Sequence, residues 1–159
     1  MKLGLIALAQ RLPDWAQAAC DDFAKRLPPH WQFAVHALKA ESRDSRPPAT
    51  VMQLEAARIE ATLAKHYGRD VRRVVLDERG RDWGSVALAE HLGQWQQDGR
   101  DTVFVIGGAD GIHPPLKAQA DVLLRLSSLT LPHALARVVL IEQVYRAWSI
   151  LSHHPYHRE

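Results

Sequence analysis

The final residues of the chain gather side chains that transfer protons, hold anions or stack on planar rings. They are His153, His154, Tyr156, His157 and Arg158, grouped around Pro155, which favours the end of a helix. An imidazole ordinarily titrates near neutral pH and can act as a general base, and a guanidinium can stabilise an anion. Because chain ends are normally frayed and bland, this segment is predicted to form part of an active site.

Two other interpretations of this segment stay open. Tyr156 and His157 could pack against a partner subunit and take no part in chemistry. His153, His154 and His157 could bind a metal, but adjacent histidines rarely converge on one ion and no nearby acidic residue completes a set. We therefore expect no metal site.

A glycine-rich loop is the second candidate site. The apolar run Val103–Ile106 leads into the sequence GGADG at 107–111, where missing Cβ atoms let the backbone approach a ligand. Ligands of open α/β sheets bind outside the carboxyl ends of the strands, although a tight turn would also explain the glycines. A dinucleotide or P-loop site is not expected, because neither an early GxGxxG nor a GxxxxGK[ST] motif occurs.

The segment LSSLTLPH, Leu126–His133, is the third candidate. Its polar members, which could bind the edge of an adenine, are Ser127, Ser128 and Thr130. Its apolar members, which could enclose the ring, are Leu126, Leu129 and Leu131. A fifth strand before the last helix is the alternative, and both can hold. For Asp77–Gly80, which follows another apolar run, a solvated turn is favoured.

Hydrophobic patterning predicts the elements that position these segments. Strands are expected at 2–9, 31–38, 71–80 and 102–106, and helices at 14–27, 51–67 and 85–98. In the first helix, apolar residues recur at Trp15, Ala19, Phe23 and Leu27. Strands that alternate with helices at this spacing predict an α/β fold with a mostly parallel sheet covered on both faces.

The last helix has an apolar band wider than burial on one side requires. The band comprises Leu135, Val138, Val139, Ile141, Val144, Tyr145, Trp148 and Leu151. Subunit association and core packing within one domain both explain it. Glu142 and Arg146, four residues apart, are interpreted first as an exposed structural pair, and as an active-site pair only if this helix lines the pocket.

Composition limits the class of protein. A chain of 159 residues with 47% hydrophobic and 24% charged residues is typical of one globular domain, here 1–159. The chain shows no secretory signal and no run of roughly 20 apolar residues, so a cytoplasmic location without membrane contact is expected. Cys20 is the only cysteine, which excludes an internal disulfide, and we expect it to be buried and inert. The net charge of +2 permits an anionic partner without requiring one.

Five segments, taken in order, resemble the RlmH family, the SPOUT-type methyltransferases that act on a pseudouridine of large-subunit ribosomal RNA. They are MKLGLIALAQRLPDW at 1–15, LDERG at 76–80, IGGADG at 106–111, LTLPHALARVVLIEQVYRAWSI at 129–150 and HPYHRE at 154–159. The resemblance spans nearly the whole chain. The chain departs from the family at Ala109-Asp110, in the helix sequence EAARI at 55–59, and in ESRDSRP at 41–47, where acidic residues interrupt a usually Lys-rich loop.

The resemblance implies an α/β fold with a C-terminal trefoil knot, and a homodimer whose active site uses both subunits. It implies S-adenosylmethionine as cofactor. The matching positions for the cofactor are Leu76, Gly107, Gly108 and the stretch Leu126–Leu131, which includes Ser127, Ser128, Leu129 and Thr130. These are loops already singled out on physical grounds.

The implied reaction is methyl transfer to N3 of pseudouridine, a nitrogen that carries a proton at neutral pH. His157 is the first candidate for the general base that removes this proton. Arg158 could stabilise the resulting anion or hold a phosphate, and Tyr156 could stack on the nucleobase. The residues expected to contact the RNA are His133, Arg137 and His154. The intact ribosome is the expected substrate, because a small chain of charge +2 offers little surface for a large free RNA.

Two alternatives remain. A SPOUT methyltransferase of another RNA, such as a transfer RNA, would share fold and cofactor. A non-catalytic nucleotide-binding dimer would also use a glycine loop and an associating helix, but it would not need the tail Tyr156–Glu159.

Overall fold

A five-stranded sheet forms the centre of the protein in the computed structural model, which describes residues 1–9 and 11–158. The strands are β1 (Leu3–Leu8), β2 (Ala34–Leu38), β3 (Arg72–Asp82), β4 (Thr102–Ile106) and β5 (Val122–Arg125). All pairings among these strands are parallel, in the order β2-β1-β4-β3-β5. The α/β prediction is therefore confirmed, whereas the trefoil knot stays a prediction.

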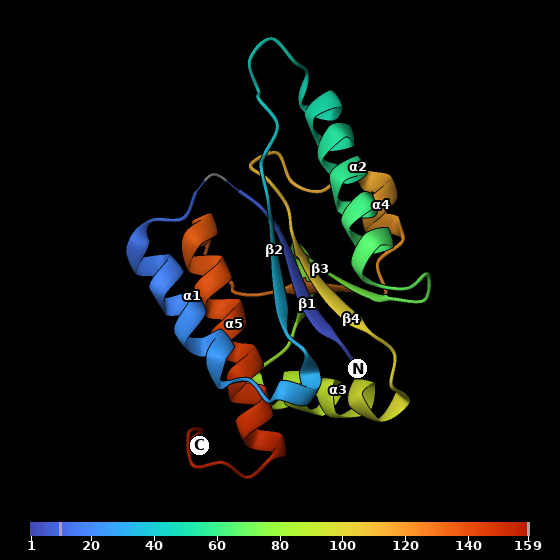
Figure 1. The fold of residues 1–159 in the computed structure, drawn as a ribbon. Coiled ribbons are helices and arrows are strands. Elements are labelled where there is room, and N and C mark those ends of the chain that lie inside the picture. Colours follow the sequence, from blue (N-terminus) through green and yellow to red (C-terminus); the bar gives the residue numbers. More distant parts are fainter. Residues whose placement is uncertain (10, 159) are drawn as a thin grey trace.

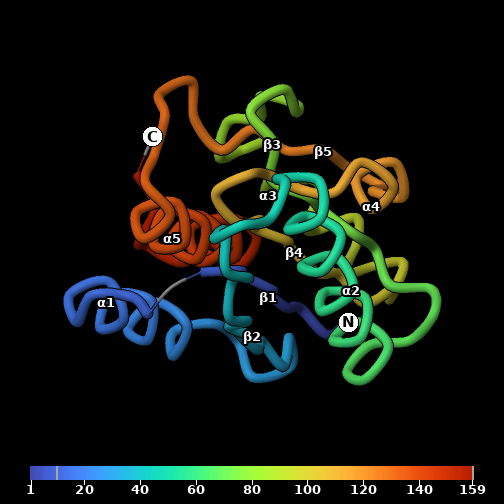
Figure 2. The backbone as a smooth tube through the Cα atoms, turned by 90° about the horizontal axis from the view of Figure 1, so that it is seen from above, coloured from blue at the N-terminus to red at the C-terminus, as the bar shows by residue number. Residues whose placement is uncertain are grey.

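The helices cover both faces of this sheet (Figures 1 and 2). They are α1 (Asp14–Arg26), α2 (Pro48–His66), α3 (Ser85–Asp98), α4 (Pro114–Ala118) and α5 (His133–Leu151), with a short 3₁₀ helix at Pro29–Trp31. Helices α1, α3 and α5 pack on one face, and α2 and α4 pack on the other. None of the described helices is both long and apolar enough to cross a membrane.

Alternation along the central strands builds two hydrophobic cores. In β1, Leu3 and Leu5 face the α1–α3–α5 layer, and Ile6 and Leu8 face the α2–α4 layer. Every residue of β1 is buried, as expected of a parallel strand covered on both faces. The carboxyl ends of β1, β3 and β4 consequently meet at one edge of the sheet.

Several predicted boundaries shift. Strand β2 begins at Ala34 because Trp31 belongs to the 3₁₀ turn, where its indole N–H donates to Gln96 Oε1 at 3.0 Å. Helix α2 begins at Pro48, a residue suited to the first helical turn. The strand proposed within 126–133 is wrong, because β5 ends at Arg125 and irregular backbone follows. Helix α4 was not predicted.

The buried face of α1 differs by one residue from the predicted spacing. Ala16 and Cys20 are buried, whereas the side chain of Trp15 is 55% exposed. The prediction that Cys20 is buried is confirmed, and burial raises the pKa of its thiol. Small residues on this face let α1 lie close to α5, and they leave Trp15 outside the core.

Strand β3 continues through the segment expected to be a solvated turn. Leu124 of β5 lies opposite both Leu76 and Arg81, so the intervening residues bulge out of the ladder. A Cβ on Gly80 would lie 2.6 Å from the backbone carbon of Leu123. Only glycine permits this approach of the two strands, and the bulge borders the candidate site.

Candidate active site

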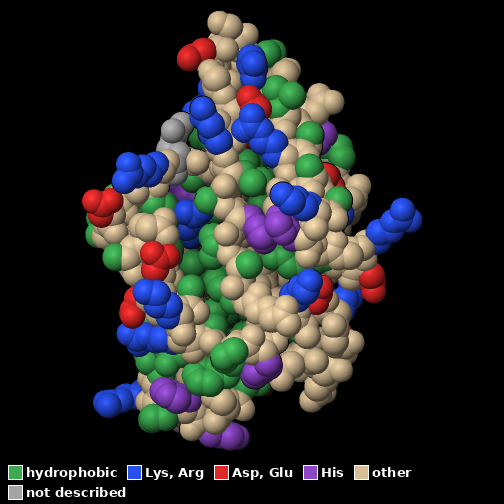
Figure 3. Space-filling model, viewed as in Figure 1, with side chains coloured by type: hydrophobic (Ala, Val, Ile, Leu, Met, Phe, Trp, Pro, Cys, Tyr) green, Lys and Arg blue, Asp and Glu red, His purple; other side chains and the backbone are tan. Residues whose placement is uncertain are grey.

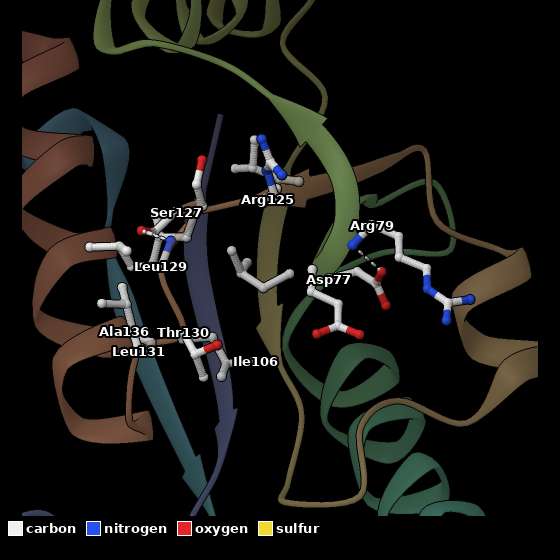
Figure 4. A pocket seen from close by; sticks show the side chains of 14 residues that line it. Asp77, Arg79, Ile106, Arg125, Ser127, Leu129, Thr130, Leu131 and Ala136 are labelled. Carbon is white, nitrogen blue, oxygen red and sulfur yellow. Dashed lines mark hydrogen bonds between the residues drawn. The ribbon is translucent and has the colours of Figure 1, made fainter.

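Two neighbouring cavities open where the carboxyl ends of the strands meet. The first cavity, of about 430 Å³, is bounded by Leu76–Arg79 of β3, Ile106 of β4, residues 124–131 and Ala136 of α5 (Figure 4). Asp77 and Arg79 lie across Ile106 from Leu129 and Leu131. A volume of this size suits a small-molecule ligand.

Seven of the nine residues predicted to bind a cofactor line this first cavity. They are Leu76, Leu126, Ser127, Ser128, Leu129, Thr130 and Leu131. The Leu129 N–H donates to Ser127 Oγ at 2.9 Å, and the neighbouring amides of Ser128 and Thr130 find no acceptor among the described residues. The segment therefore presents backbone donors to a ligand beside leucine side chains.

Asp77 places a carboxylate at the opposite wall. Asp77 Oδ1 accepts the backbone N–H of Arg79 at 2.8 Å, and Asp77 Oδ2 forms an ion pair with Lys117 Nζ at 2.6 Å. Burial acts to raise the pKa of Asp77, but the hydrogen bonds and charges of Lys117 and Arg79 outweigh it and lower that pKa from 3.8. Asp77 is therefore an anion at neutral pH, a role that the interpretation of 77–80 as a solvated turn missed.

The second cavity, of about 960 Å³, lies between the loop 39–44, helix α2, the glycine loop and the start of α5. Gly107 and Gly108, the other two predicted cofactor residues, line it. It shares Ile106, Leu131 and Ala136 with the first cavity, so the two are adjacent.

The carboxyl-terminal tail, His153–Arg158, folds back against α5. His153 adopts a left-handed φ of 55°, and the His154 N–H donates to the Ser149 carbonyl at 2.8 Å, which ends the helix before Pro155. The Tyr156 ring lies beside Phe23 and Tyr145. Within its own chain, the tail is thus an ordered, packed segment.

Glu142 holds the Tyr156 hydroxyl. Glu142 Oε1 accepts the Tyr156 O–H at 2.9 Å and the Arg146 guanidinium at 2.6 Å, and this guanidinium lies over the Tyr156 ring. The predicted exposed pair is wrong in one respect, because Glu142 is largely buried and belongs to the tail contact. Burial, followed by the Glu142 carboxylate, raises the pKa of Tyr156.

Ser149 orients His157, a contact that the sequence did not reveal. Ser149 Oγ donates to the Arg146 carbonyl at 2.7 Å, so its lone pairs face His157 Nδ1 at 3.2 Å. This arrangement assigns the proton of a neutral imidazole to Nδ1. His157 Nε2 is then left as the proton acceptor.

The tail and the cavities lie apart in one chain. No residue of the described tail lines either cavity. His157 contacts Ser149, which lies thirteen residues along α5 from Ala136, a residue that lines both cavities; this is about 20 Å at 1.5 Å per residue. Figure 1 shows the same separation, with the C-terminus at the opposite end of α5 from the carboxyl ends of the strands.

The predicted RNA contacts occupy two places. His133 lines the second cavity, where burial and then the charge of Arg137 lower its pKa. Arg137 is only 4% exposed, and its Nε and Nη2 find no partner among the described residues. His154 lies instead against Trp148, in the tail. A buried, unpaired guanidinium is costly, so we expect Arg137 to bind an anion that the described residues of one chain do not supply.

Basic side chains gather at the upper end of the face shown in Figure 3, over the loop between β2 and α2. Part of this charge is neutralised locally, because Arg43 pairs with Asp110 at 2.9 Å and Arg46 pairs with Glu41 at 2.9 Å. Among the described residues, no group of three or more His, Cys, Asp or Glu side chains could hold a metal ion.

Comparison with known proteins agrees with this geometry. A family profile described as "Predicted SPOUT methyltransferase" matches residues 1–157. The chain belongs to the SPOUT methyltransferase family. It is 54% identical to a protein of Paraburkholderia xenovorans (strain LB400) and 55% identical to one of Ralstonia pickettii (strain 12J), each over 99% of both chains. Both relatives are named ribosomal RNA large subunit methyltransferase H, as is one of Burkholderia mallei (strain SAVP1) at 53% identity and the same coverage.

Proposed function

We propose that this SPOUT methyltransferase transfers a methyl group from S-adenosylmethionine to N3 of a pseudouridine in large-subunit ribosomal RNA. Support comes from relatives of more than 50% identity that carry the rRNA methyltransferase name along their full length. The carrying observation is the first cavity, in which separate loops predicted to bind a cofactor meet. Ribosomes are cytoplasmic, so this proposal places the enzyme in the cytoplasm.

The first cavity fits S-adenosylmethionine. Leu126, Leu129 and Leu131 would enclose the adenine, and the free amides of Ser128 and Thr130 would meet its polar edge. Asp77, which is an anion, would face a cationic part of the ligand. Bound there, the cofactor supplies an electrophilic methyl group on a sulfonium.

The residues of the chain must make N3 nucleophilic. A general base of the protein would take the N3 proton, the electron pair left on nitrogen would form the new N–CH₃ bond, and the methyl donor would leave with the electron pair of its former S–CH₃ bond. His157 Nε2 is the base in this proposal, because Ser149 directs its other ring nitrogen. Arg158, which is exposed, would stabilise the imide anion, and Tyr156 would stack on the base.

We infer that the active site is formed by two copies of the chain. The distance along α5 from Ser149, which contacts His157, to Ala136, which lines both cavities, is about 20 Å at 1.5 Å per residue. Side chains cannot bridge this distance, so in this proposal the tail serves the cavities of a second subunit. Exposed hydrophobic side chains on α1 and α5 support association of two chains: Trp15 of α1 is 55% exposed, and Leu135 and Leu151 of α5 are 39% and 36% exposed. The unpaired Arg137 guanidinium would gain an anion from the partner subunit or from RNA.

Methyl transfer to ribosomes tests the proposal. Ribosomes from a strain lacking the endogenous enzyme are incubated with the protein and labelled S-adenosylmethionine, and the modified nucleoside is identified by mass spectrometry. We expect 3-methylpseudouridine, lost when 156–159 are removed. Cofactor binding without a ribosomal product, but with methylated transfer RNA, would move the substrate to that RNA. Binding without any product would favour the non-catalytic dimer.

A further inference from the structure

The second cavity contains a buried carboxylate that has a hydrogen-bond partner at only one of its two oxygens among the described residues. Glu55 of α2 lines it and is 3% exposed. Its Oε2 accepts the Glu41 N–H at 3.1 Å, while Oε1 has no partner among the described residues. A buried carboxylate oxygen without a donor is costly, so a ligand with a hydrogen-bond donor is the expected complement.

Gly108 places this carboxylate beside the glycine loop. A Cβ at Gly108 would lie 2.8 Å from Glu55 Oε1, so the missing side chain leaves room for the carboxylate in its present position. Two other acidic groups of the cavity are paired: Glu41 with Arg46 and Arg58, and Asp110 with Arg43. Asp44, the remaining one, is exposed to solvent and accepts the Ser42 hydroxyl. Glu55 is therefore the buried acceptor that the cavity offers to a ligand.

The remaining walls suit a planar ring. Apolar side chains of Leu8, Leu12, Val51, Ile106 and Leu131 line the cavity. Lys39 and Arg11 add positive charge, and Lys39 has no carboxylate within ion-pair distance among the described residues. Apolar walls, one acceptor and cationic side chains together match a nucleobase with a free N–H and the phosphate next to it.

We propose that the second cavity receives the target pseudouridine and that Glu55 Oε1 accepts its N1–H. This inference rests on the proposed function and deepens it. The two cavities share Ile106 and Leu131, so a base held here lies next to the first cavity. Pseudouridine has two ring N–H groups, and N3–H must lose its proton, which leaves N1–H for Glu55. Uridine has no N1–H, because N1 carries its glycosidic bond, so Glu55 distinguishes the two nucleosides.

The variant Glu55→Gln converts the acceptor into a donor. In the variant, the Glu41 N–H would still donate to the side-chain oxygen of Gln, so the NH₂ group of Gln would point into the cavity. This NH₂ group and the N1–H of pseudouridine are both donors and cannot form a hydrogen bond with each other. Glu60→Gln is the matched control, because Glu60 lies on the same helix and pairs with Arg73 at 2.6 Å, away from both cavities. Substrates are ribosomes carrying pseudouridine at the target and ribosomes from a strain that leaves uridine there.

We expect Glu55→Gln to lower kcat/KM on pseudouridine ribosomes by about 10- to 100-fold, which corresponds to the free energy of one hydrogen bond to a charged group. On uridine ribosomes, where the wild type lacks this hydrogen bond and should react more slowly, the variant should have the same kcat/KM as the wild type. The Kd for S-adenosylmethionine, measured by calorimetry, should stay at the wild-type value. Glu60→Gln should match wild type in all three measurements.

Three results would overturn the assignment of Glu55. First, Glu55→Gln could bind S-adenosylmethionine more weakly yet still discriminate between the two kinds of ribosome, which would place the methionine end of the cofactor in this cavity. Second, the variant could lose the same factor in kcat/KM on both kinds of ribosome. Third, it could discriminate between them as well as the wild type does, with the cofactor Kd unchanged. If the wild-type protein methylates neither kind of ribosome, the proposed function itself fails, and the two failures are thereby distinguished.

Discussion

His157 Nδ1 lies 3.2 Å from the hydroxyl oxygen of Ser149, a side chain with no exposed surface. Because Ser149 Oγ gives its own proton to the Arg146 carbonyl, it can only accept from the imidazole. One buried hydroxyl thereby selects the ring nitrogen that is left to accept a proton. This contact joins the carboxyl-terminal tail to the last turn of α5.

Replacing Ser149 with Ala should lower kcat roughly tenfold, since the imidazole loses its orienting partner, and should leave the cofactor Kd unchanged. Ser152→Ala is the control, because Ser152 Oγ also donates to a helix carbonyl, that of Trp148, but does not contact His157. Adding Ser149→Ala to His157→Ala should cost little more activity. Additive losses in this double-mutant cycle would show that Ser149 acts only through the fold.

The contact of Glu142 with Tyr156 predicts a second effect on the tail. Glu142→Ala leaves both the Tyr156 hydroxyl and the Arg146 guanidinium without their acceptor. We expect a looser tail, seen as faster amide exchange near Tyr156, and roughly a tenfold loss of methyl transfer. Asp22→Asn removes a comparable i,i+4 pair, with Arg26, outside the tail and should have little effect. Unchanged exchange and activity in Glu142→Ala would contradict this role.

The sequence predicted what is locally encoded. Runs such as Val103–Ile106 indicated buried parallel strands, and glycines marked the loop after them. A fifth strand was offered as an alternative within 126–133, after its actual position, because the four residues of β5, Val122–Arg125, form a strand only through pairing with β3. Glu55 and Ser149 were missed because their roles depend on contacts that only the folded chain forms. Glu55 accepts the N–H of Glu41 from the loop before α2, and Ser149 contacts His157 of the tail.

A shared active site predicts complementation between inactive variants. Deletion of 156–159 removes the tail, and Ser127→Trp fills the first cavity. A refolded equimolar mixture should recover about a quarter of wild-type activity, since half of the dimers are mixed and each contains one intact site of two. Each variant alone should be inactive. Absence of recovery, with mixed dimers verified by mass spectrometry, would argue against a tail that serves the partner.

The close approach of Gly80 to β5 predicts that adding a single methyl group at this position destabilises the β3–β5 pairing. Gly80→Ala forces a Cβ to within 2.6 Å of the β5 backbone, which cannot move as a side chain can. We expect a loss of roughly 1–3 kcal/mol in the free energy of unfolding, measured with urea. At Gly68 nothing lies within 4 Å of the added Cβ, so Gly68→Ala should be neutral or slightly stabilising. Equal effects of the two changes would contradict the close approach.

Glu55 predicts a dependence of stability on pH. Burial, with the charges of Asp110 and Glu41, raises the pKa of Glu55 above its ordinary 4.5, although the Glu41 N–H opposes the shift. The folded protein thus keeps this proton to a higher pH than the unfolded chain does. The stability from this group is fully present below about pH 4.5 and is lost as pH rises through the folded pKa, so the raised pKa weakens the ligand-free fold toward higher pH.

Glu55→Gln, which is neutral at every pH, should therefore raise the melting temperature at pH 7, by about 2–4 °C for each kcal/mol of penalty removed. The difference from wild type should shrink as the pH falls toward 4.5. Scanning calorimetry of both proteins and of Glu60→Gln across this range measures it. If Glu55→Gln is more stable than wild type but no longer distinguishes pseudouridine from uridine, the carboxylate of Glu55 serves function at the expense of stability. A variant destabilised at pH 7 would instead indicate that Glu55 supports the fold.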